Sequence, residues 1–255
     1  MTYKRSKYFT TSSKRKIKYL FIQKNSKMTI VFFHGFMSDM IGAKPMAIQK
    51  FCRNKKLNFL KFEYSGHGKS KGEFTKGNIS KWTDEAKQLI RAKIKNNKNI
   101  IFIGSSMGSW IALNLFSYFK KQIKGFMGIA SAPEFLEDLM WRKFSKKIKK
   151  TILREKIYNL KHGDYTYPIT KQLIFDGRKN KILNNKINLK IPIVLFHGLK
   201  DEVVPLTVSK KILKICKKSQ KKLIKIKNGN HSLSRKNDLK KICFELNEMI
   251  KNHIV

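Results

Sequence analysis

The hydrophobic positions of this chain follow two spacings in turn, which predicts a sheet covered by helices. A continuous apolar run, typical of a strand buried on both faces, occupies 28–34, and further strands are predicted over 57–63, 99–104, 123–130 and 191–196. Shorter alternating runs predict two strands within 8–23 and one over 222–227. Apolar residues at helical spacing predict helices over 79–95, 106–120, 206–218 and 237–252, and another with Pro45 in its first turn.

The alternation of strand and helix stops at 131 and returns at about 191. Between these points the segment reads as helical and irregular, and it is punctuated by Pro133 and Pro168. Strands that alternate with helices are typical of an α/β fold with a parallel sheet. We therefore predict one domain over 1–255, with a mostly parallel, doubly wound sheet and a helical lid inserted at about 133–189.

The charge of the chain is far from balanced. It has 57 Lys and Arg against 16 Asp and Glu, a formal net charge of +41, which would suit a polyanionic partner. However, 49 of the 57 are Lys and only 8 are Arg, and the chain also has 30 Ile and 18 Asn. Lys, Ile and Asn have A/T-rich codons, and Arg is the residue suited to bidentate contacts with phosphate and guanine. We therefore interpret the lysines as compositional and expect no specific nucleic-acid partner.

Cysteine content and hydropathy indicate the cellular compartment in which the protein is expected. Three cysteines without a CxxC pair favour a reducing compartment and predict neither a disulfide framework nor a zinc site. No apolar run reaches the ~18 residues of a membrane span. The basic N-terminus lacks the apolar region of a secretory signal, and strand-like residues begin by about Tyr8. We therefore expect a cytoplasmic protein without a membrane span. The oligomeric state is not indicated.

A G-x-S-x-G motif over 104–108 places Ser106 between an apolar strand and a helix. This strand–turn–helix context is that of a nucleophile elbow, in which two glycines allow a sharp turn that exposes the serine. The alternative is a Gly- and Ser-rich helix N-terminus with no chemistry. A serine nucleophile needs a base, and no H-E-x-x-H spacing or other ligand pattern indicates a metal. We predict a serine hydrolase that requires no cofactor.

The partners of Ser106 are predicted from chain order, which in this context runs Ser, Asp or Glu, then His. Asp201 follows the strand at 191–196, and His231 follows the strand at 222–227, so both lie at the carboxyl edge of the sheet. Glu202 is the competing acid. His197 is better interpreted as part of a tight turn, and His67 as a support near the site.

The loop after the strand at 28–34 is the candidate source of the oxyanion hole. Gly35 allows the backbone to turn, and we predict the N–H groups of Phe36 and Met107 as the two donors. Because these are backbone groups, the first donor could instead be Met37.

Several segments together resemble an alpha/beta-hydrolase-domain family of esterases and thioesterases. The segments are YFTTSS (8–13), HGFMSDMIGAK (34–44), EYSGHGKSKGEF (63–74), GSSMGSW (104–110), EDLMW (137–141), YPITKQLIFDGR (167–178) and NGNHSLS (228–234). The resemblance spans nearly the whole chain and includes the lid. The chain departs from the family pattern at Ser109, Glu63 and His34, which stand where Gly, Asp and Pro are usual.

The resemblance implies an alpha/beta-hydrolase fold and a serine hydrolase that cleaves acyl esters or thioesters, with S-acyl proteins and acyl glucuronides among candidate substrates. It places Ser106, Asp201 and His231 at the family's triad positions. An apolar cluster at the start of the lid, which includes Met140 and Trp141, is the candidate acyl-binding wall, and its alternative is packing of the lid on the core. The rival function is a non-enzymatic polyanion-binding protein on a hydrolase scaffold.

Overall fold

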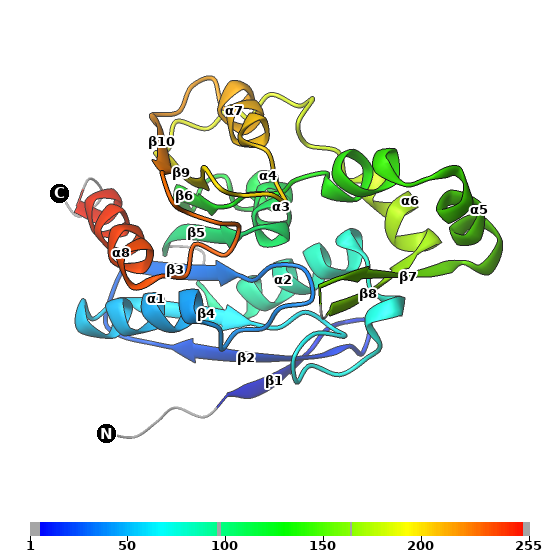
Figure 1. Cartoon of the computed structure of the whole chain (residues 1–255). Coiled ribbons are helices and arrows are strands. Elements are labelled where there is room, and N and C mark those ends of the chain that lie inside the picture. The colour runs from blue at the N-terminus through cyan, green and yellow to red at the C-terminus, as the bar shows by residue number, and fades with distance from the viewer. Residues whose placement is uncertain (1–5, 96–97, 164, 252–255) are drawn as a thin grey trace.

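A computed structural model describes residues 6–95, 98–163 and 165–251 of the chain. In these residues eight strands form one sheet in the order β1-β2-β4-β3-β5-β6-β9-β10, in which β2 runs antiparallel to its neighbours β1 and β4 and the six strands from β4 to β10 are parallel (Figure 1). The strands are β1 (Lys7–Thr10), β2 (Lys16–Ile22), β3 (Met28–Phe33), β4 (Asn58–Phe62), β5 (Asn99–Ser105), β6 (Ile123–Ile129), β9 (Ile193–Gly198) and β10 (Lys221–Ile226). The mostly parallel, doubly wound sheet is as predicted.

The period of two along each strand divides the core into two layers. In β3, Val31 and Phe33 belong to one buried cluster while Ile30 and Phe32 belong to the other. Successive side chains of a strand point to opposite faces, so an unbroken apolar run supplies both layers at once. The continuous run over 28–34 therefore marks a central strand of a sheet that is covered on both faces.

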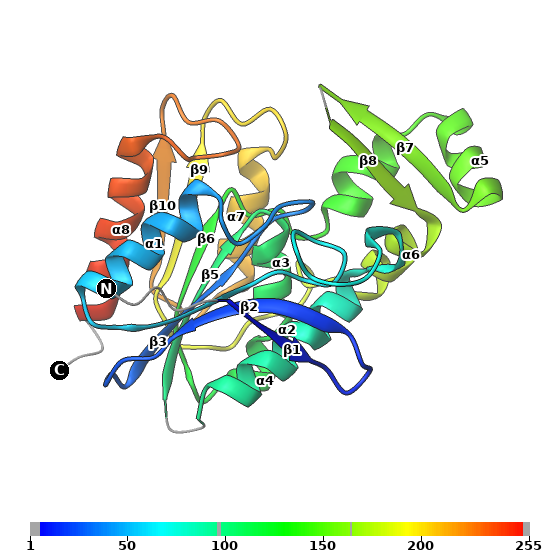
Figure 2. The same cartoon turned by 90° about the horizontal axis from the view of Figure 1, so that it is seen from below.

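Two groups of helices cover these faces (Figure 2). The helices are α1 (Ala43–Asn54) and α8 (Lys236–Lys251) on one face, and α2 (Ile79–Lys93), α3 (Met107–Asn114), α4 (Phe116–Phe119) and α7 (Leu206–Ile215) on the other. The helix predicted over 106–120 is divided into α3 and α4 at Leu115. All other predicted helices begin and end within a few residues of the expected positions.

The insertion between β6 and β9 contains more than the helices that were expected. It comprises a π-helical turn (Leu136–Met140), a 3-10 turn (Trp141–Lys143), α5 (Lys146–Glu155), β7 (Ile157–His162), β8 (Tyr165–Thr170) and α6 (Lys171–Lys179). The antiparallel pair β7–β8 was not expected in this segment, which was predicted to be helical and irregular. Pro168 had suggested a break, but each strand of a two-stranded ribbon has an open edge, where a missing N–H is tolerated.

The lid is fastened to the domain at its base. Glu134 lies where the insertion begins, and its carboxylate accepts hydrogen bonds from the backbone N–H groups of Ile182 and Leu183 at 2.7 Å each. Arg178 of α6 forms an ion pair with Glu137 at 2.7 Å. The entrance and exit of the insertion are therefore held together, and α6 packs against the π-helical turn.

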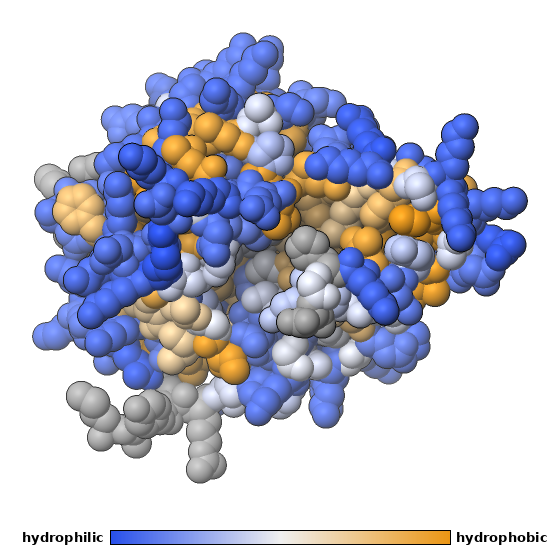
Figure 3. Space-filling model, in the orientation of Figure 1, coloured by the Kyte–Doolittle hydropathy of each residue, from blue (hydrophilic) through white to orange (hydrophobic). Residues whose placement is uncertain are grey.

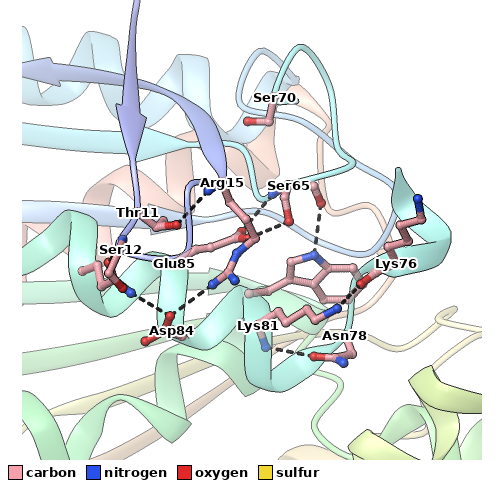
Figure 4. Close-up of polar contacts among 12 residues, drawn as sticks. Thr11, Ser12, Arg15, Ser65, Ser70, Lys76, Asn78, Lys81, Asp84 and Glu85 are labelled. Carbon is pink, nitrogen blue, oxygen red and sulfur yellow. Dashed lines mark hydrogen bonds and ion pairs between the residues drawn. The ribbon is translucent and has the colours of Figure 1, made fainter. Parts of the chain in front are cut away.

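A buried ion pair connects the N-terminal hairpin to the glycine-rich loop after β4 (Figure 4). Arg15 Nε donates to Glu85 of α2 at 2.7 Å, and Glu85 accepts from both the N–H and the hydroxyl of Ser65. Burial raises the pKa of the Glu85 carboxyl, although the hydrogen bonds from Ser65 and the charge of Arg15 oppose the rise. Asn78 caps α2 by accepting from the N–H of Lys81 at 2.9 Å. Glu85 thus anchors the start of the loop that carries His67 to α2.

Within the described ranges, no helix is both long enough and apolar enough to cross a membrane. The same residues contain no group of three or more His, Cys, Asp or Glu side chains that could hold a metal ion.

Candidate active site

Ser106 lies at the turn between β5 and α3. Its backbone has φ 51° and ψ −119°, a conformation that L-residues rarely adopt and that marks a strained turn. The turn is possible because the glycines two positions before and two positions after Ser106 lack side chains. A Cβ atom on Gly104 would lie 2.5 Å from the backbone of Ser109, and one on Gly108 would lie 2.2 Å from the carbonyl oxygen of Phe33. The two glycines of the motif are therefore required by close approach of backbone to backbone.

The structure brings the three predicted triad residues into one hydrogen-bonded chain. Ser106 Oγ lies 3.0 Å from Nε2 of His231, and Nδ1 of His231 lies 2.8 Å from Oδ2 of Asp201. They come from the loops after β5, β10 and β9, whose carboxyl ends share one edge of the parallel sheet. A carboxylate accepts only, so Nδ1 of His231 donates to Asp201 and Nε2 faces the serine hydroxyl.

The loop after β9 places Asp201, and not Glu202, against the histidine. Oδ1 of Asp201 accepts from the N–H groups of Val203 and Val204 at 2.9 and 2.8 Å, and its side chain has no exposed surface. Burial by itself would raise the pKa of Asp201, but the hydrogen bond and charge of His231 and the two N–H donors hold that pKa below its usual value. Glu202 lines the cavity and is exposed, so Asp201 is the acid that contacts the histidine.

His197 supports this acid loop, a role that its interpretation as part of a turn did not include. Its Nε2 lies 3.1 Å from the carbonyl oxygen of Val204, and its Nδ1 lies 2.9 Å from the hydroxyl of Ser209. The carbonyl can only accept, so Nε2 carries the proton and Nδ1 accepts from the serine. Burial lowers the pKa of His197, which favours this neutral form.

The two predicted oxyanion donors lie on either side of Ser106. Phe36 follows β3, and Met107 directly follows the serine at the start of α3. Neither backbone N–H donates a hydrogen bond to any residue that the structure describes. Gly35 packs against the serine, since a Cβ atom built on it would lie 3.4 Å from Cβ of Ser106. Met37, the alternative donor, has φ 48° in the turn that follows.

A cavity of about 630 Å³ opens above Ser106 and His231. Figure 3 shows apolar surface at the lid, along with other apolar patches on a mostly hydrophilic face. The oxyanion loop and the lid contribute a mostly apolar side of the cavity, which also includes Lys143 and Lys161; its apolar residues are Phe36, Phe135, Leu139, Met140, Phe144, Leu160 and Tyr167. The side next to the histidine loop is polar, with Lys44, Ser232 and Ser234.

The structure separates the two lid residues that were predicted to bind substrate. Met140 lines the cavity, whereas Trp141 is not among the lining residues. The Trp141 ring instead lies beneath the guanidinium of Arg178, 4.9 Å from ring centroid to Cζ, and near the ammonium of Lys149. Trp141 therefore contacts other parts of the lid, whereas its alternative interpretation was packing of the lid on the core.

One side chain that contacts the histidine loop was not predicted from the sequence. Nζ of Lys44 in α1 donates to the carbonyl oxygen of Ser232 and to the hydroxyl of Ser234. Burial lowers the pKa of Lys44 to about 8, although the charge of Asp238 opposes the shift. No local signal distinguishes this lysine from the 48 others in the chain, so only the tertiary structure reveals the contact.

Comparison with known proteins gives three findings. Residues 24–172 match the family model Hydrolase_4, described as "Serine aminopeptidase, S33". The mitochondrial palmitoyl-protein thioesterases ABHD10 of Bos taurus and Homo sapiens are each 25% identical to this chain, over 87% of it and 72% of their own length. A putative hydrolase from Agrobacterium vitis S4 superposes with a TM-score of 0.91 at 27% identity, covering 96% of this chain and 98% of that one. Mouse alpha/beta hydrolase domain-containing protein 10 has a TM-score of 0.88 at 23% identity, with 97% and 99% covered.

Proposed function

Because the chain belongs to the Hydrolase_4 family of alpha/beta hydrolases, described as serine aminopeptidase S33, we propose that it is a serine hydrolase that cleaves acyl esters or acyl thioesters. The observation that carries the proposal is the chain of hydrogen bonds from Ser106 through His231 to Asp201 at the floor of a partly apolar cavity. The names of the thioesterase relatives favour an acyl substrate. S-acylated proteins are therefore candidate substrates, and acyl glucuronides are candidates from the resemblance of the sequence segments alone.

The proposed reaction begins with attack of Ser106 Oγ on the acyl carbonyl. His231 Nε2 takes the hydroxyl proton, and Asp201 stabilises the imidazolium through its hydrogen bond to Nδ1. The carbonyl oxygen becomes an oxyanion that accepts from the N–H groups of Phe36 and Met107. His231 then returns the proton to the departing alcohol or thiol, which leaves the acyl group on the serine. Water, activated in the same way, releases the acid and restores the enzyme.

The division of the cavity suggests how the substrate lies. The leaving group must lie beside His231, which protonates it, so it faces the polar side with Lys44, Ser232 and Ser234. The acyl chain then extends along the apolar side, past Phe36 and Met140. We propose a substrate in which a hydrophobic acyl chain is joined to a polar leaving group. A cytoplasmic location of the protein remains a prediction.

The test compares Ser106→Ala with Ser219→Ala. Ser219 is a buried serine close to the amino end of β10, at the sheet edge away from the cavity, and its hydroxyl bonds to Leu189 O at 2.7 Å. Substrates are p-nitrophenyl esters, an acyl thioester and an aminoacyl anilide, with a fluorophosphonate probe as label. Ser106→Ala should lose turnover by about 10⁴- to 10⁶-fold together with all labelling, while Ser219→Ala keeps both. Persistent labelling of folded Ser106→Ala, or turnover of the anilide alone, would overturn the proposal.

A further inference from the structure

His34 lies directly after β3 and is 1% exposed, and both of its ring nitrogens face backbone groups. Nδ1 lies 2.8 Å from the carbonyl oxygen of Gly35, and Nε2 lies 3.4 Å from the backbone N of Tyr64, which donates to it. Neither partner can exchange its role, because a carbonyl only accepts and a backbone N–H only donates. The surroundings therefore select one state of the ring, neutral and protonated on Nδ1.

This contact restrains one particular peptide unit. The Gly35 carbonyl oxygen, which His34 holds, belongs to the same planar group as the N–H of Phe36, and the two point in opposite directions across a trans peptide. The same oxygen also accepts from the N–H of Ser38 at 3.3 Å. Two donors therefore hold the carbonyl on the buried side of the loop, and the Phe36 N–H is directed away from them.

The direction of that N–H matters because the loop after β3 adjoins the nucleophile. Gly35 packs against Ser106, and Gly35, Phe36 and Ser106 all line the cavity. We propose that neutral His34 is a positioning residue, which aims the Phe36 N–H at the oxyanion by holding the Gly35 carbonyl. The inference rests on the proposed serine hydrolase function and adds a residue to it.

The environment of His34 also keeps its ring uncharged. The rings of Tyr64 and His67 lie 4.4 and 5.1 Å from it, centroid to centroid, and among the described residues no acidic side chain forms a hydrogen bond or ion pair with it. Burial lowers the pKa of His34 to about 4 and places that of His67 well below its usual value. A charged ring would need a second acceptor at Nε2, where Tyr64 presents a donor.

The test separates binding of the oxyanion from binding of the ground state. A trifluoromethyl ketone with the acyl chain of a good ester substrate forms a bond from Ser106 Oγ to its carbonyl carbon, and the former carbonyl oxygen becomes an oxyanion. Its inhibition constant therefore reports the oxyanion hole, whereas KM of the ester reports the acyl pocket. The two substitutions at the site are His34→Leu, which removes the donor, and His34→Asn, a smaller side chain whose amide nitrogen can donate from a position close to that of Nδ1.

His34→Leu should lower kcat and raise the inhibition constant by about 100-fold, as expected for loss of one oxyanion donor, with KM changed less than about threefold. His34→Asn should recover most of both losses. The matched control is His67→Leu, since His67 is equally buried but its Nδ1 contacts the carbonyl oxygen of Ser65 at 3.3 Å. It should lose stability while the ratio of inhibition constant to KM stays at the wild-type value. An unchanged ratio in folded His34→Leu would overturn the inference.

A second measurement uses the unmodified protein. Long-range ¹⁵N–¹H NMR spectra of the imidazole rings distinguish the two tautomers, and His34 should be protonated on Nδ1. Protonation on Nε2 would refute the contact with Gly35, even if no variant at this position folds. This readout does not depend on catalysis, so it separates failure of this inference from failure of the proposed function.

Discussion

A Cβ atom on Gly108 would lie 2.2 Å from the carbonyl oxygen of Phe33, so the first turn of α3 touches the end of β3 backbone to backbone. This contact places the serine turn directly against the oxyanion loop. Because the atom that a Cβ at Gly108 would meet belongs to the backbone and not to a flexible side chain, it cannot move aside easily.

Gly108→Ala should therefore destabilise the domain by about 3 kcal/mol, at the upper end of the range for overpacking, and should lower probe labelling of Ser106 in the fraction that folds. Urea unfolding and labelling rates measure the two effects. The control is Gly42→Ala, because nothing lies within 4 Å of a Cβ at that position and its φ of −62° suits any residue. Equal stability of the two variants would contradict the role of close approach.

The choice of acid can be tested at two adjacent positions. Asp201→Asn should lower kcat by about 10⁴-fold, because the hydrogen bond that orients His231 and the charge that stabilises its imidazolium are both lost. Glu202→Gln should retain activity within about threefold, since Glu202 is an exposed side chain on the cavity wall. Steady-state kinetics decide the matter, and a severe loss in Glu202→Gln alone would make Glu202 the acid.

The separation of Met140 and Trp141 predicts different effects on acyl selectivity. Met140→Ala enlarges the apolar side of the cavity and should change the ratio of kcat/KM between short and long acyl chains by about 10-fold. Trp141→Ala should lower stability without changing that ratio, because its ring packs on Arg178 instead. A series of p-nitrophenyl esters of increasing chain length measures both. A selectivity change in Trp141→Ala alone would reverse the assignment.

The contact between Arg235 and Asp238 predicts a pH-dependent contribution to stability. The hydrogen bonds from the Arg235 guanidinium hold the pKa of the Asp238 carboxyl below its usual value, although burial opposes this. A lowered folded-state pKa stabilises the fold above the carboxyl's ordinary pKa, and this contribution is lost as the pH falls through the lower value.

Asp238→Asn should accordingly cost about 1–2 kcal/mol of unfolding free energy at pH 7, and the difference from wild type should shrink as the pH falls well below 4. Urea titrations at a series of pH values measure it. A difference that stays constant with pH would show that the carboxylate charge is not the cause.

The net charge of +41 predicts salt-sensitive association with polyanions. Binding of the protein to duplex DNA or heparin should be independent of sequence, fall steeply between about 50 and 200 mM salt, and tolerate single Lys→Gln substitutions. Fluorescence anisotropy with two unrelated duplexes measures this. Tight, sequence-selective binding at about 150 mM salt by a protein without hydrolase activity would favour the polyanion-binding alternative.

Most elements of the fold could be predicted because their signals are local. β3 is an almost unbroken apolar run, since both faces of the sheet are covered, and α2 shows its buried face at helical spacing. The hairpin β7–β8 was missed because a two-stranded ribbon with an open edge tolerates Pro168, which in a central strand would be excluded. Whether a strand position lies at an open edge, and so tolerates proline, depends on its neighbours in the sheet, which the sequence does not reveal.

The sequence by itself determined the fold class and the three residues of the candidate triad. Parallel strands deliver the loops that follow them to one edge, so chain order was sufficient to place Ser106, Asp201 and His231 together. Only the tertiary structure decided between Met140 and Trp141 as cavity wall, and only it revealed the contacts of His34 and Lys44. These depend on which atoms of distant segments meet at hydrogen-bond distance, and neither spacing nor composition encodes the direction of a ring nitrogen or of a peptide plane.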